Sequence, residues 1–125
     1  MKNKKKILII EDDLDIERTL RLRLEMEGLE VISAHEGYEG FYKAMTQGAD
    51  LIILDLKLPG LPGEEICKEL RKYEKGSSLP IIMLTAKDTD VDKVIGKVIG
   101  ASHYMGKPFD IDELMEKIST LLKEK

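Results

Sequence analysis

The sequence has little cysteine and no long apolar run. Cys67 is its only cysteine, so no internal disulfide can form, and we interpret this residue as core filler in a reducing compartment. Its aliphatic runs, such as residues 7–10, are four residues long, whereas a membrane-spanning helix needs roughly 20 apolar residues. Residues 7–10 are also too short for a signal-peptide core and lead directly into acidic residues. We therefore expect a cytoplasmic protein that does not span a membrane.

Basic residues are fewer than acidic ones and form only one cluster. The 20 Lys and Arg residues are outnumbered by 24 Asp and Glu residues, giving a net charge of −4. The one basic cluster, at residues 2–6, is typical of a solubilising N-terminal flank, and without an Arg/Lys stripe we expect no direct binding to nucleic acid. The length, with no linker or repeat, predicts a single domain over residues 1–125 with a core from about 6 to 122.

Apolar segments of strand length alternate with amphipathic segments of helix length. The expected strands are residues 7–10, 29–33, 51–54, 81–84 and 101–105. Apolar residues repeat at helical spacing between and after them: Ile16, Leu20 and Leu24; Phe41, Ala44 and Met45; Ile66, Leu70 and Tyr73; Val91, Val94, Ile95 and Val98; Ile111, Leu114, Ile118 and Leu121. Asp15 is a possible cap of the first helix, and Asp110 with Glu113 has the spacing of a capping pair for the last.

This alternation predicts the α/β class. Strands that alternate with helices form a parallel sheet covered on both faces. We expect a doubly wound, flavodoxin-like (βα)5 fold with a five-stranded parallel sheet and five helices.

Polar residues follow four of the expected strands. Such sheets bind ligands at the carboxyl ends of their strands, so these residues should share one edge. Taken singly, each has an ordinary explanation as a loop residue, a cap or a surface lysine. They are Glu11, Asp12 and Asp13, then Asp55, then Thr85 and Ala86, and finally Lys107 and Pro108.

Together these residues predict a metal site. Glu11, Asp12 and Asp55 would repel one another, and Lys107 would neutralise only one of the three charges. Hard oxygen ligands with open positions suit Mg²⁺. A carboxylate nucleophile beside Mg²⁺, a lysine and the Thr85 hydroxyl is an arrangement for phosphoryl transfer.

These motifs resemble the receiver domains of bacterial two-component response regulators, the family of the chemotaxis regulator. The resemblance covers about residues 6–122 and rests on Glu11-Asp12 after "ILII", Asp55 in "LDLKLPGLPG", Thr85-Ala86 in "IIMLTA" and Lys107 in "GKPF". The intervals between Asp12, Asp55, Thr85 and Lys107 are 43, 30 and 22 residues, and they agree with the family.

The resemblance implies a role for each site residue. Asp55 would be the phosphoacceptor, taking a phosphoryl group from a phosphohistidine on a sensor histidine kinase or a phosphotransfer protein. Asp12, Asp55 and the backbone carbonyl of Lys57 would bind Mg²⁺ directly, and Glu11 would act through a bound water.

The resemblance also implies a switch. Lys107 would pair with the phosphoryl group, and its bond to Pro108 would be cis. The Thr85 hydroxyl would swing onto the phosphoryl group and Tyr104 would turn inward. The surface formed by the fourth helix, fifth strand and fifth helix would change for a downstream effector protein. Such a protein is not an enzyme beyond its own phosphorylation and dephosphorylation.

Three positions depart from receivers that form dimers through their last helices. Those proteins carry an acidic pair before the tyrosine and an arginine in the final helix, whereas this sequence has Ser102-His103 and Lys117. We therefore expect either a monomer or a phosphorylation-dependent homodimer. His35 and His103 are isolated in the sequence, so we expect surface or loop roles for both.

Three alternative functions would place other requirements on the same residues. A flavodoxin-like cofactor binder needs a phosphate cradle where Glu11-Asp12-Asp13 stands. A phosphatase with an aspartyl-phosphate intermediate needs an acid where Lys57 stands. A receiver-like module that is never phosphorylated would not need the intact set of Asp12, Asp55, Thr85 and Lys107. Because the sequence carries no effector domain, we expect either a stand-alone receiver or part of a longer regulator.

Overall fold

The computed structural model describes residues 4–85 and 100–123. Five parallel strands form one sheet in the order β2-β1-β3-β4-β5. Along the chain the elements are β1 (Lys6–Ile10), α1 (Leu14–Met26), β2 (Glu30–Ala34), α2 (Gly37–Thr46), β3 (Leu51–Asp55), α3 (Gly63–Arg71), the 3-10 turn η1 (Glu74–Gly76), β4 (Ile81–Thr85), β5 (His103–Gly106) and α5 (Ile111–Lys123).

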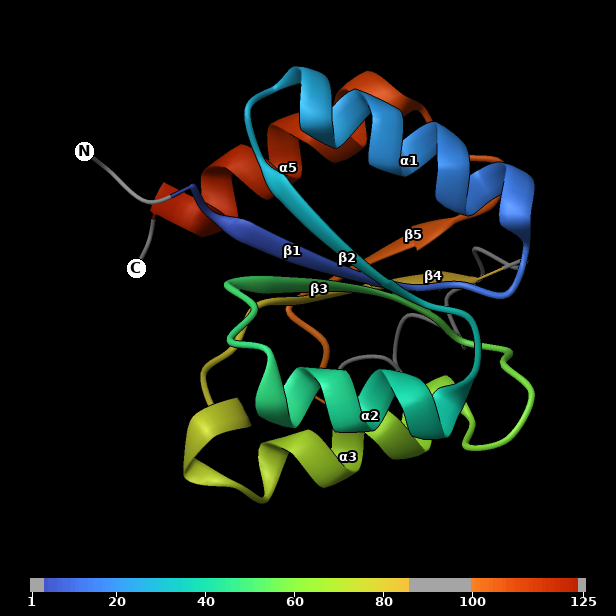
Figure 1. Cartoon of the computed structure of the whole chain (residues 1–125), viewed down its shortest axis with the longest axis vertical. Coiled ribbons are helices and arrows are strands. Elements are labelled where there is room, and N and C mark those ends of the chain that lie inside the picture. Colours follow the sequence, from blue (N-terminus) through green and yellow to red (C-terminus); the bar gives the residue numbers. More distant parts are fainter. Residues whose placement is uncertain (1–3, 86–99, 124–125) are drawn as a thin grey trace.

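The helices cover both faces of the sheet, as Figure 1 shows. Ile7 and Ile9 of β1 pack in the cluster under α1 and α5, whereas Leu8 and Ile10 belong to the cluster under α2 and α3. This alternation is why the central strands are continuous aliphatic runs rather than alternating ones. The doubly wound parallel fold expected from the sequence is confirmed. The helix expected over residues 91–98 lies outside the described residues.

The central strands β3 and β4 are buried along their whole length. Each extends one residue beyond its predicted aliphatic run, so Asp55 and Thr85 are the last residues of these strands. A rigid, buried strand gives its last side chain a fixed direction. Among the described residues, no helix combines the length and apolar character needed to cross a membrane.

The helix starts correct one prediction and agree with another. Asp13, not Asp15, is the N-cap of α1, because its carboxylate accepts hydrogen bonds from the backbone N–H groups of Asp15 and Ile16. The helix begins at Leu14, directly after the acidic triplet and two residues earlier than a cap at Asp15 implies. Asp110 accepts from the N–H groups of Asp112 and Glu113 at the start of α5, as its position predicts.

A buried glutamate joins α1 to the edge strand β2. Glu17 accepts hydrogen bonds from the Ser33 hydroxyl and from Arg21 Nε at 2.9 Å. Burial alone would raise the pKa of the Glu17 carboxyl, but the bonds from Arg21 and Ser33 bring it below its usual value. On the other side of β2, Lys43 Nζ of α2 donates to the Ser33 carbonyl at 2.7 Å. Both helices are thus tied to the same residue of the strand.

At the edge of the sheet where its strands begin, Arg71 connects three segments. Its guanidinium donates to the carbonyls of Gly76 (2.7 Å), Leu79 (2.6 Å) and Gly100 (2.9 Å), and burial lowers its pKa. The Ser102 hydroxyl lies beside it and accepts from the N–H of Ile81 at 3.0 Å. Arg71 therefore fixes the starts of β4 and β5 relative to α3.

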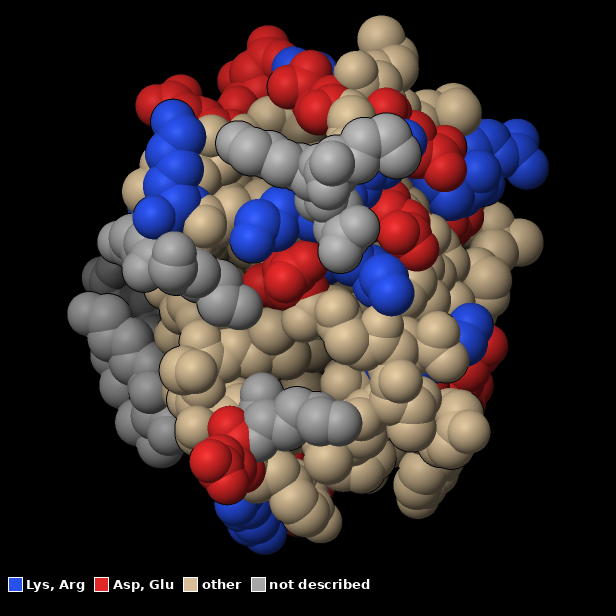
Figure 2. All heavy atoms as spheres, turned by 60° about the vertical axis from the view of Figure 1, so that its left-hand side comes forward, with Lys and Arg blue, Asp and Glu red and all other residues tan. Residues whose placement is uncertain are grey.

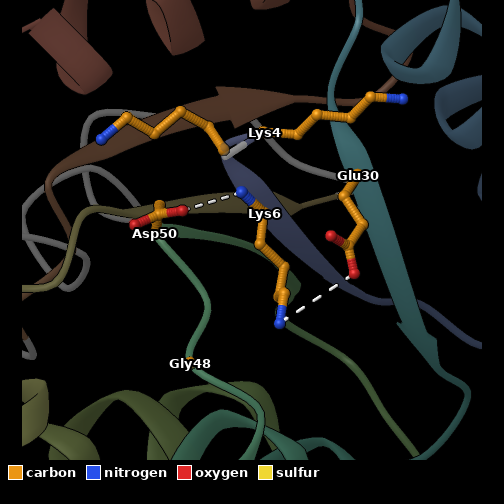
Figure 3. Close-up of a pocket in the computed structure, with 6 residues that line it drawn as sticks. Lys4, Lys6, Glu30, Gly48 and Asp50 are labelled. Carbon is orange, nitrogen blue, oxygen red and sulfur yellow. Dashed lines mark hydrogen bonds and ion pairs between the residues drawn. The ribbon is translucent and has the colours of Figure 1, made fainter. Parts of the chain in front are cut away.

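The same edge carries the basic N-terminal residues. Lys4, Lys5 and Lys6 line a shallow hollow with Glu30, Gly48 and Asp50 (Figure 3). The Lys6 backbone N–H donates to Asp50 at 2.8 Å, and its Nζ lies 4.0 Å from Glu30. Lys6 is the first residue of β1, so it belongs to the sheet rather than to the flank.

Charge is unevenly spread over the face in Figure 2. Charged side chains gather over the α1/α5 layer and the sheet edge, whereas most of the surface over the α2/α3 layer is uncharged. The α2/α3 layer also exposes three aromatic residues: Tyr38 and Tyr42 are each 65% exposed and Tyr73 is 46% exposed.

Candidate functional site

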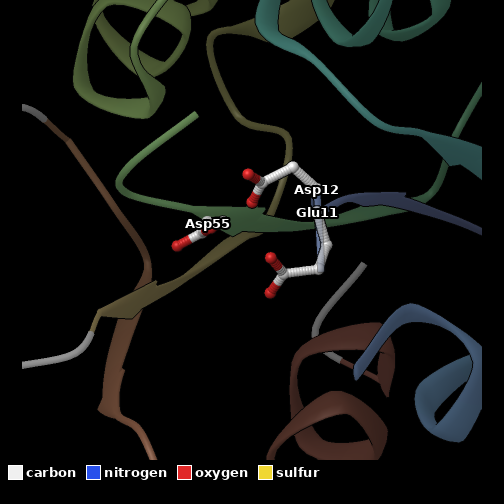
Figure 4. A group of neighbouring side chains, drawn as sticks. All are labelled: Glu11, Asp12 and Asp55. Carbon is white, nitrogen blue, oxygen red and sulfur yellow. The ribbon is translucent and has the colours of Figure 1, made fainter. Parts of the chain in front are cut away.

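Three carboxylates meet where β1 and β3 end. Glu11 and Asp12 follow β1, Asp55 ends β3, and each offers one oxygen within 4.8 Å of the others. Figure 4 shows the three side chains pointing to the same side of the sheet edge. Glu11 and Asp55 are buried, at 1% and 6% exposure, whereas Asp12 is exposed. The clustering expected from the strand ends is therefore present.

Lys107 provides the cation of this cluster. It follows β5, and its Nζ lies 2.9 Å from Glu11 Oε1 and 3.4 Å from Asp55 Oδ1. Burial would lower the pKa of this ammonium, but the bond to Glu11 and the charge of Asp55 raise it. The peptide bond between Lys107 and Pro108 is cis, as the resemblance implied. The ammonium thus stays charged between the two buried carboxylates.

One lysine does not compensate this much negative charge. Burial raises the pKa of Glu11 to about 7; the hydrogen bond from Lys107 opposes this, and the neighbouring Asp55 adds to it. The second oxygen of Glu11 accepts from the N–H of Asp13 at 3.2 Å. The metal-free site therefore favours a proton on Glu11 near neutral pH.

The carboxylates of Glu11, Asp12 and Asp55 are suitable ligands for Mg²⁺. The three acids offer hard oxygen ligands, and a divalent cation would stabilise the ionised form of Glu11, which burial and the neighbouring Asp55 disfavour. Asp12 and Lys57 also line one hollow of about 510 Å³, with Leu56, Leu58, Pro59, Pro62 and Glu64. Asp12 and Lys57, both predicted to bind the metal, therefore line the same hollow.

The remaining predicted residues lie on the last two strands. Thr85 is buried at the end of β4, pairs with Gly106 of β5, and its carbonyl accepts from the Lys107 N–H at 2.6 Å. Tyr104 is half-buried in β5 opposite Met83, near the middle of the strand. Thr85 therefore lies at the edge of the sheet that holds Asp55 and Lys107. Tyr104 lies two residues before Gly106, the last residue of β5 at that edge.

In the part of the chain that the structure describes, the carboxylate cluster includes neither histidine. His35 is exposed after β2, and His103 is half-buried at the start of β5. Burial, together with the charge of Lys117, lowers the pKa of His103. Ser102, which stands where receivers that dimerise through their last helices carry an acidic residue, is exposed, and its hydroxyl accepts from the Ile81 N–H at 3.0 Å.

Sequence reasoning missed the start of α2 as a neighbour of the site. Gly37 donates its N–H to the Pro59 carbonyl at 3.0 Å, in the loop that follows Asp55. The available signal was a glycine shortly before the apolar stripe of the second expected helix, which is too common to identify a contact 22 residues away.

The fold and the site define a class of small α/β proteins whose acidic cluster and lysine meet at the carboxyl edge of a parallel sheet. The family model for the response regulator receiver domain matches residues 7–119. The chain belongs to the receiver domain family of two-component response regulators.

Curated relatives from Bacillus subtilis (strain 168) are about twice as long as the chain. The uncharacterized transcriptional regulatory protein YkoG is 47% identical over 118 residues, which cover 94% of this chain and 51% of YkoG. The alkaline phosphatase synthesis transcriptional regulatory protein PhoP is 44% identical over 119 residues, 95% of this chain and 49% of PhoP. The chain spans about half the length of these relatives.

Solved structures agree with the fold. A CheY-like receiver domain protein from Methanospirillum hungatei JF-1 has a TM-score of 0.89 and 33% identity, covering 98% of this chain and 96% of that one. The receiver domain of sensor histidine kinase PA1611 from Pseudomonas aeruginosa PAO1, solved with a magnesium ion in its active site cleft, has a TM-score of 0.88 and 29% identity. That match covers 97% of this chain and 99% of that one.

Proposed function

We propose that this receiver accepts a phosphoryl group on Asp55 in a Mg²⁺-dependent reaction and acts as a signalling switch. The observation that carries the proposal is the ammonium of Lys107 held between the buried carboxylates of Glu11 and Asp55, with Asp12 beside them. The proposed donor is a phosphohistidine on a sensor histidine kinase or phosphotransfer protein, and the proposed location is the cytoplasm.

In the proposed reaction an oxygen of Asp55 attacks the phosphorus of phosphohistidine. The new O–P bond forms as the P–N bond breaks, and the imidazole leaves with the electron pair of that bond. Lys107 keeps the Asp55 carboxylate oriented and its ammonium faces the charge on the phosphoryl oxygens. Bound by Asp12, Asp55 and the Lys57 carbonyl, with Glu11 acting through a water, Mg²⁺ would neutralise phosphoryl charge.

A hollow beside the site supports a protein donor. It lies between α1 and the start of α5 and is mostly apolar, with Lys107 at its border. Its apolar lining comes from Ile16, Pro108, Phe109 and Ile111. Apolar side chains of a partner that presents its phosphohistidine to Asp55 could be buried there.

The first test uses a small phosphodonor. Incubation of the protein with acetyl phosphate and Mg²⁺ should add one phosphoryl group, measured by intact mass, and a chelator should prevent it. Equal labelling in the chelator would contradict the metal requirement. No labelling at all, with a cognate kinase as well as acetyl phosphate, would favour an interaction module that is never phosphorylated.

The second prediction concerns the output. We propose that phosphorylation changes the surface of β5, α5 and the helix expected over residues 91–98 through Thr85 and Tyr104, for an effector protein, without catalysis on any other substrate. The variant Thr85→Ala should still be phosphorylated but should not transmit the change, because it lacks the hydroxyl that gains a charged acceptor. Hydrogen exchange over residues 91–106, with and without beryllofluoride, measures this. Identical responses in wild type and variant would refute the role of Thr85.

A further inference from the structure

The loop after the proposed phosphoacceptor is held by the start of α2. The loop, residues 56–62, connects β3 to α3 and carries Lys57. Gly37, the first residue of α2, is buried and donates its N–H to the Pro59 carbonyl at 3.0 Å. A Cβ on Gly37 would overlap the carbonyl group of Leu61. The backbones of α2 at Gly37 and of the loop at Leu61 therefore lie too close together for any side chain at residue 37.

Two further contacts come from the same helix turn. Gly60 has a φ of +75°, and a Cβ built on it would lie 2.5 Å from Glu36 Oε2 and 3.2 Å from Tyr38 Cδ2. The Glu36 carboxylate and the Tyr38 ring thus cover the tip of the loop. The Tyr42 ring, one helix turn further and equally exposed, is not among the atoms nearest to Gly60.

The other end of the loop is anchored on β3 itself. Gly63 donates its N–H to the Leu56 carbonyl at 3.1 Å, and a Cβ there would overlap the Asp55 carbonyl. The loop is therefore fixed behind Asp55 by Gly63 and at its tip by α2. Its free side is the hollow that Lys57 lines with Asp12. Lys57 lies between these anchors: its own N–H is 3.4 Å from Asp55 Oδ1, and α2 contacts the loop two residues further on, at Pro59.

We propose that Gly37 is a positioning residue of the cation site, which acts on the Lys57 carbonyl through the loop of residues 56–62. The inference rests on the proposed function, since it concerns how the proposed Mg²⁺ ligands are arranged. A purely structural role for Gly37, as a packing residue of α2, predicts lost stability and unchanged affinity for Mg²⁺. The two readings differ in a measurable way.

The test compares two glycines with the same steric constraint. Gly76 is buried like Gly37, and a Cβ on it would overlap the Leu70 carbonyl, at the opposite edge of the sheet. We expect both Gly37→Ala and Gly76→Ala to lower the melting temperature. Only Gly37→Ala should raise the Kd for Mg²⁺, by about 10-fold or more, as is usual when a group that orients a metal ligand is lost. Calorimetric titration with Mg²⁺, well below both melting temperatures, measures this.

A milder pair covers the case in which Gly37→Ala does not fold. Tyr38→Ala removes the ring over Gly60, and Tyr42→Ala removes an equally exposed ring elsewhere on α2. In the metal-free protein, amides of residues 57–61 should exchange faster in Tyr38→Ala than in Tyr42→Ala, and the Kd for Mg²⁺ should rise only in Tyr38→Ala. Unchanged Mg²⁺ affinity in both Gly37→Ala and Tyr38→Ala overturns the inference while wild type still binds Mg²⁺. Absence of Mg²⁺ binding by wild type overturns the proposed function as well.

Discussion

The variant Asp55→Asn is expected to take up no phosphoryl group from acetyl phosphate or from a cognate kinase. Asparagine has the shape of aspartate, and its amide oxygen can still accept from the Lys57 N–H, which lies 3.4 Å from Asp55 Oδ1. An amide is not an anionic nucleophile, so the step that forms the O–P bond is lost. The change also removes one of two carboxylates facing Lys107.

The matched control is Asp50→Asn, at the other end of β3. Asp50 immediately precedes β3 and accepts from the Lys6 N–H at 2.8 Å, so Asp50→Asn also changes a carboxylate bonded to backbone. It should be phosphorylated like wild type. Intact mass and peptide mapping measure the label. If Asp55→Asn is labelled as strongly as Asp50→Asn, another residue is the acceptor.

In the metal-free protein, Glu11 is expected to reduce stability as the pH rises from about 4.5 to about 7, the range between the ordinary pKa of glutamate and the raised pKa of Glu11. A carboxyl with a higher pKa in the folded state binds more protons folded than unfolded in that range, so raising the pH favours unfolding. Glu11→Gln should remove this loss. Each pKa unit is worth about 1.4 kcal/mol, so the variant should gain about 3 kcal/mol at pH 8 in a chelator.

Glu17→Gln is the matched control, since Glu17 is also a buried glutamate but its pKa is lowered. It should destabilise the protein at pH 8, because Arg21 and Ser33 lose their anionic partner. Urea unfolding in a chelator at pH 5 and pH 8 measures both variants. Added Mg²⁺ at about 100 times its Kd should stabilise wild type by about 2.7 kcal/mol and Glu11→Gln by less. A Glu11→Gln protein less stable than wild type at pH 8 would contradict the raised pKa of Glu11.

The sequence predicts much of this fold because its signals are local. The aliphatic runs before Glu11, Asp55 and Thr85 are typical of buried strands, and parallel strands bring their carboxyl ends to one edge. The meeting of three acids with Lys107 followed from that topology. Their roles in phosphoryl transfer stay predictions.

The features that sequence reasoning missed depend on contacts between distant segments. Glu17 occupies an ordinary position of an amphipathic helix and is buried only because Ser33 of β2 lies opposite it. Arg71 looks like a surface residue at a helix end, yet it binds carbonyls up to 29 residues away. The placement of Gly37 against Leu61 likewise depends on how α2 packs. None of these contacts has a periodic signal in the sequence.

The contacts on Ser33 have a consequence for association between molecules. The Ala34 carbonyl accepts from Glu11, so it faces the interior of the sheet, and the Ser33 carbonyl faces the open edge of β2. An open edge can pair with a strand of another chain and extend the sheet into an aggregate. The Lys43 ammonium donates a hydrogen bond to the Ser33 carbonyl, so an incoming strand would have to displace a charged group. The contact that fastens α2 to the sheet thereby also protects the molecule against edge-to-edge aggregation.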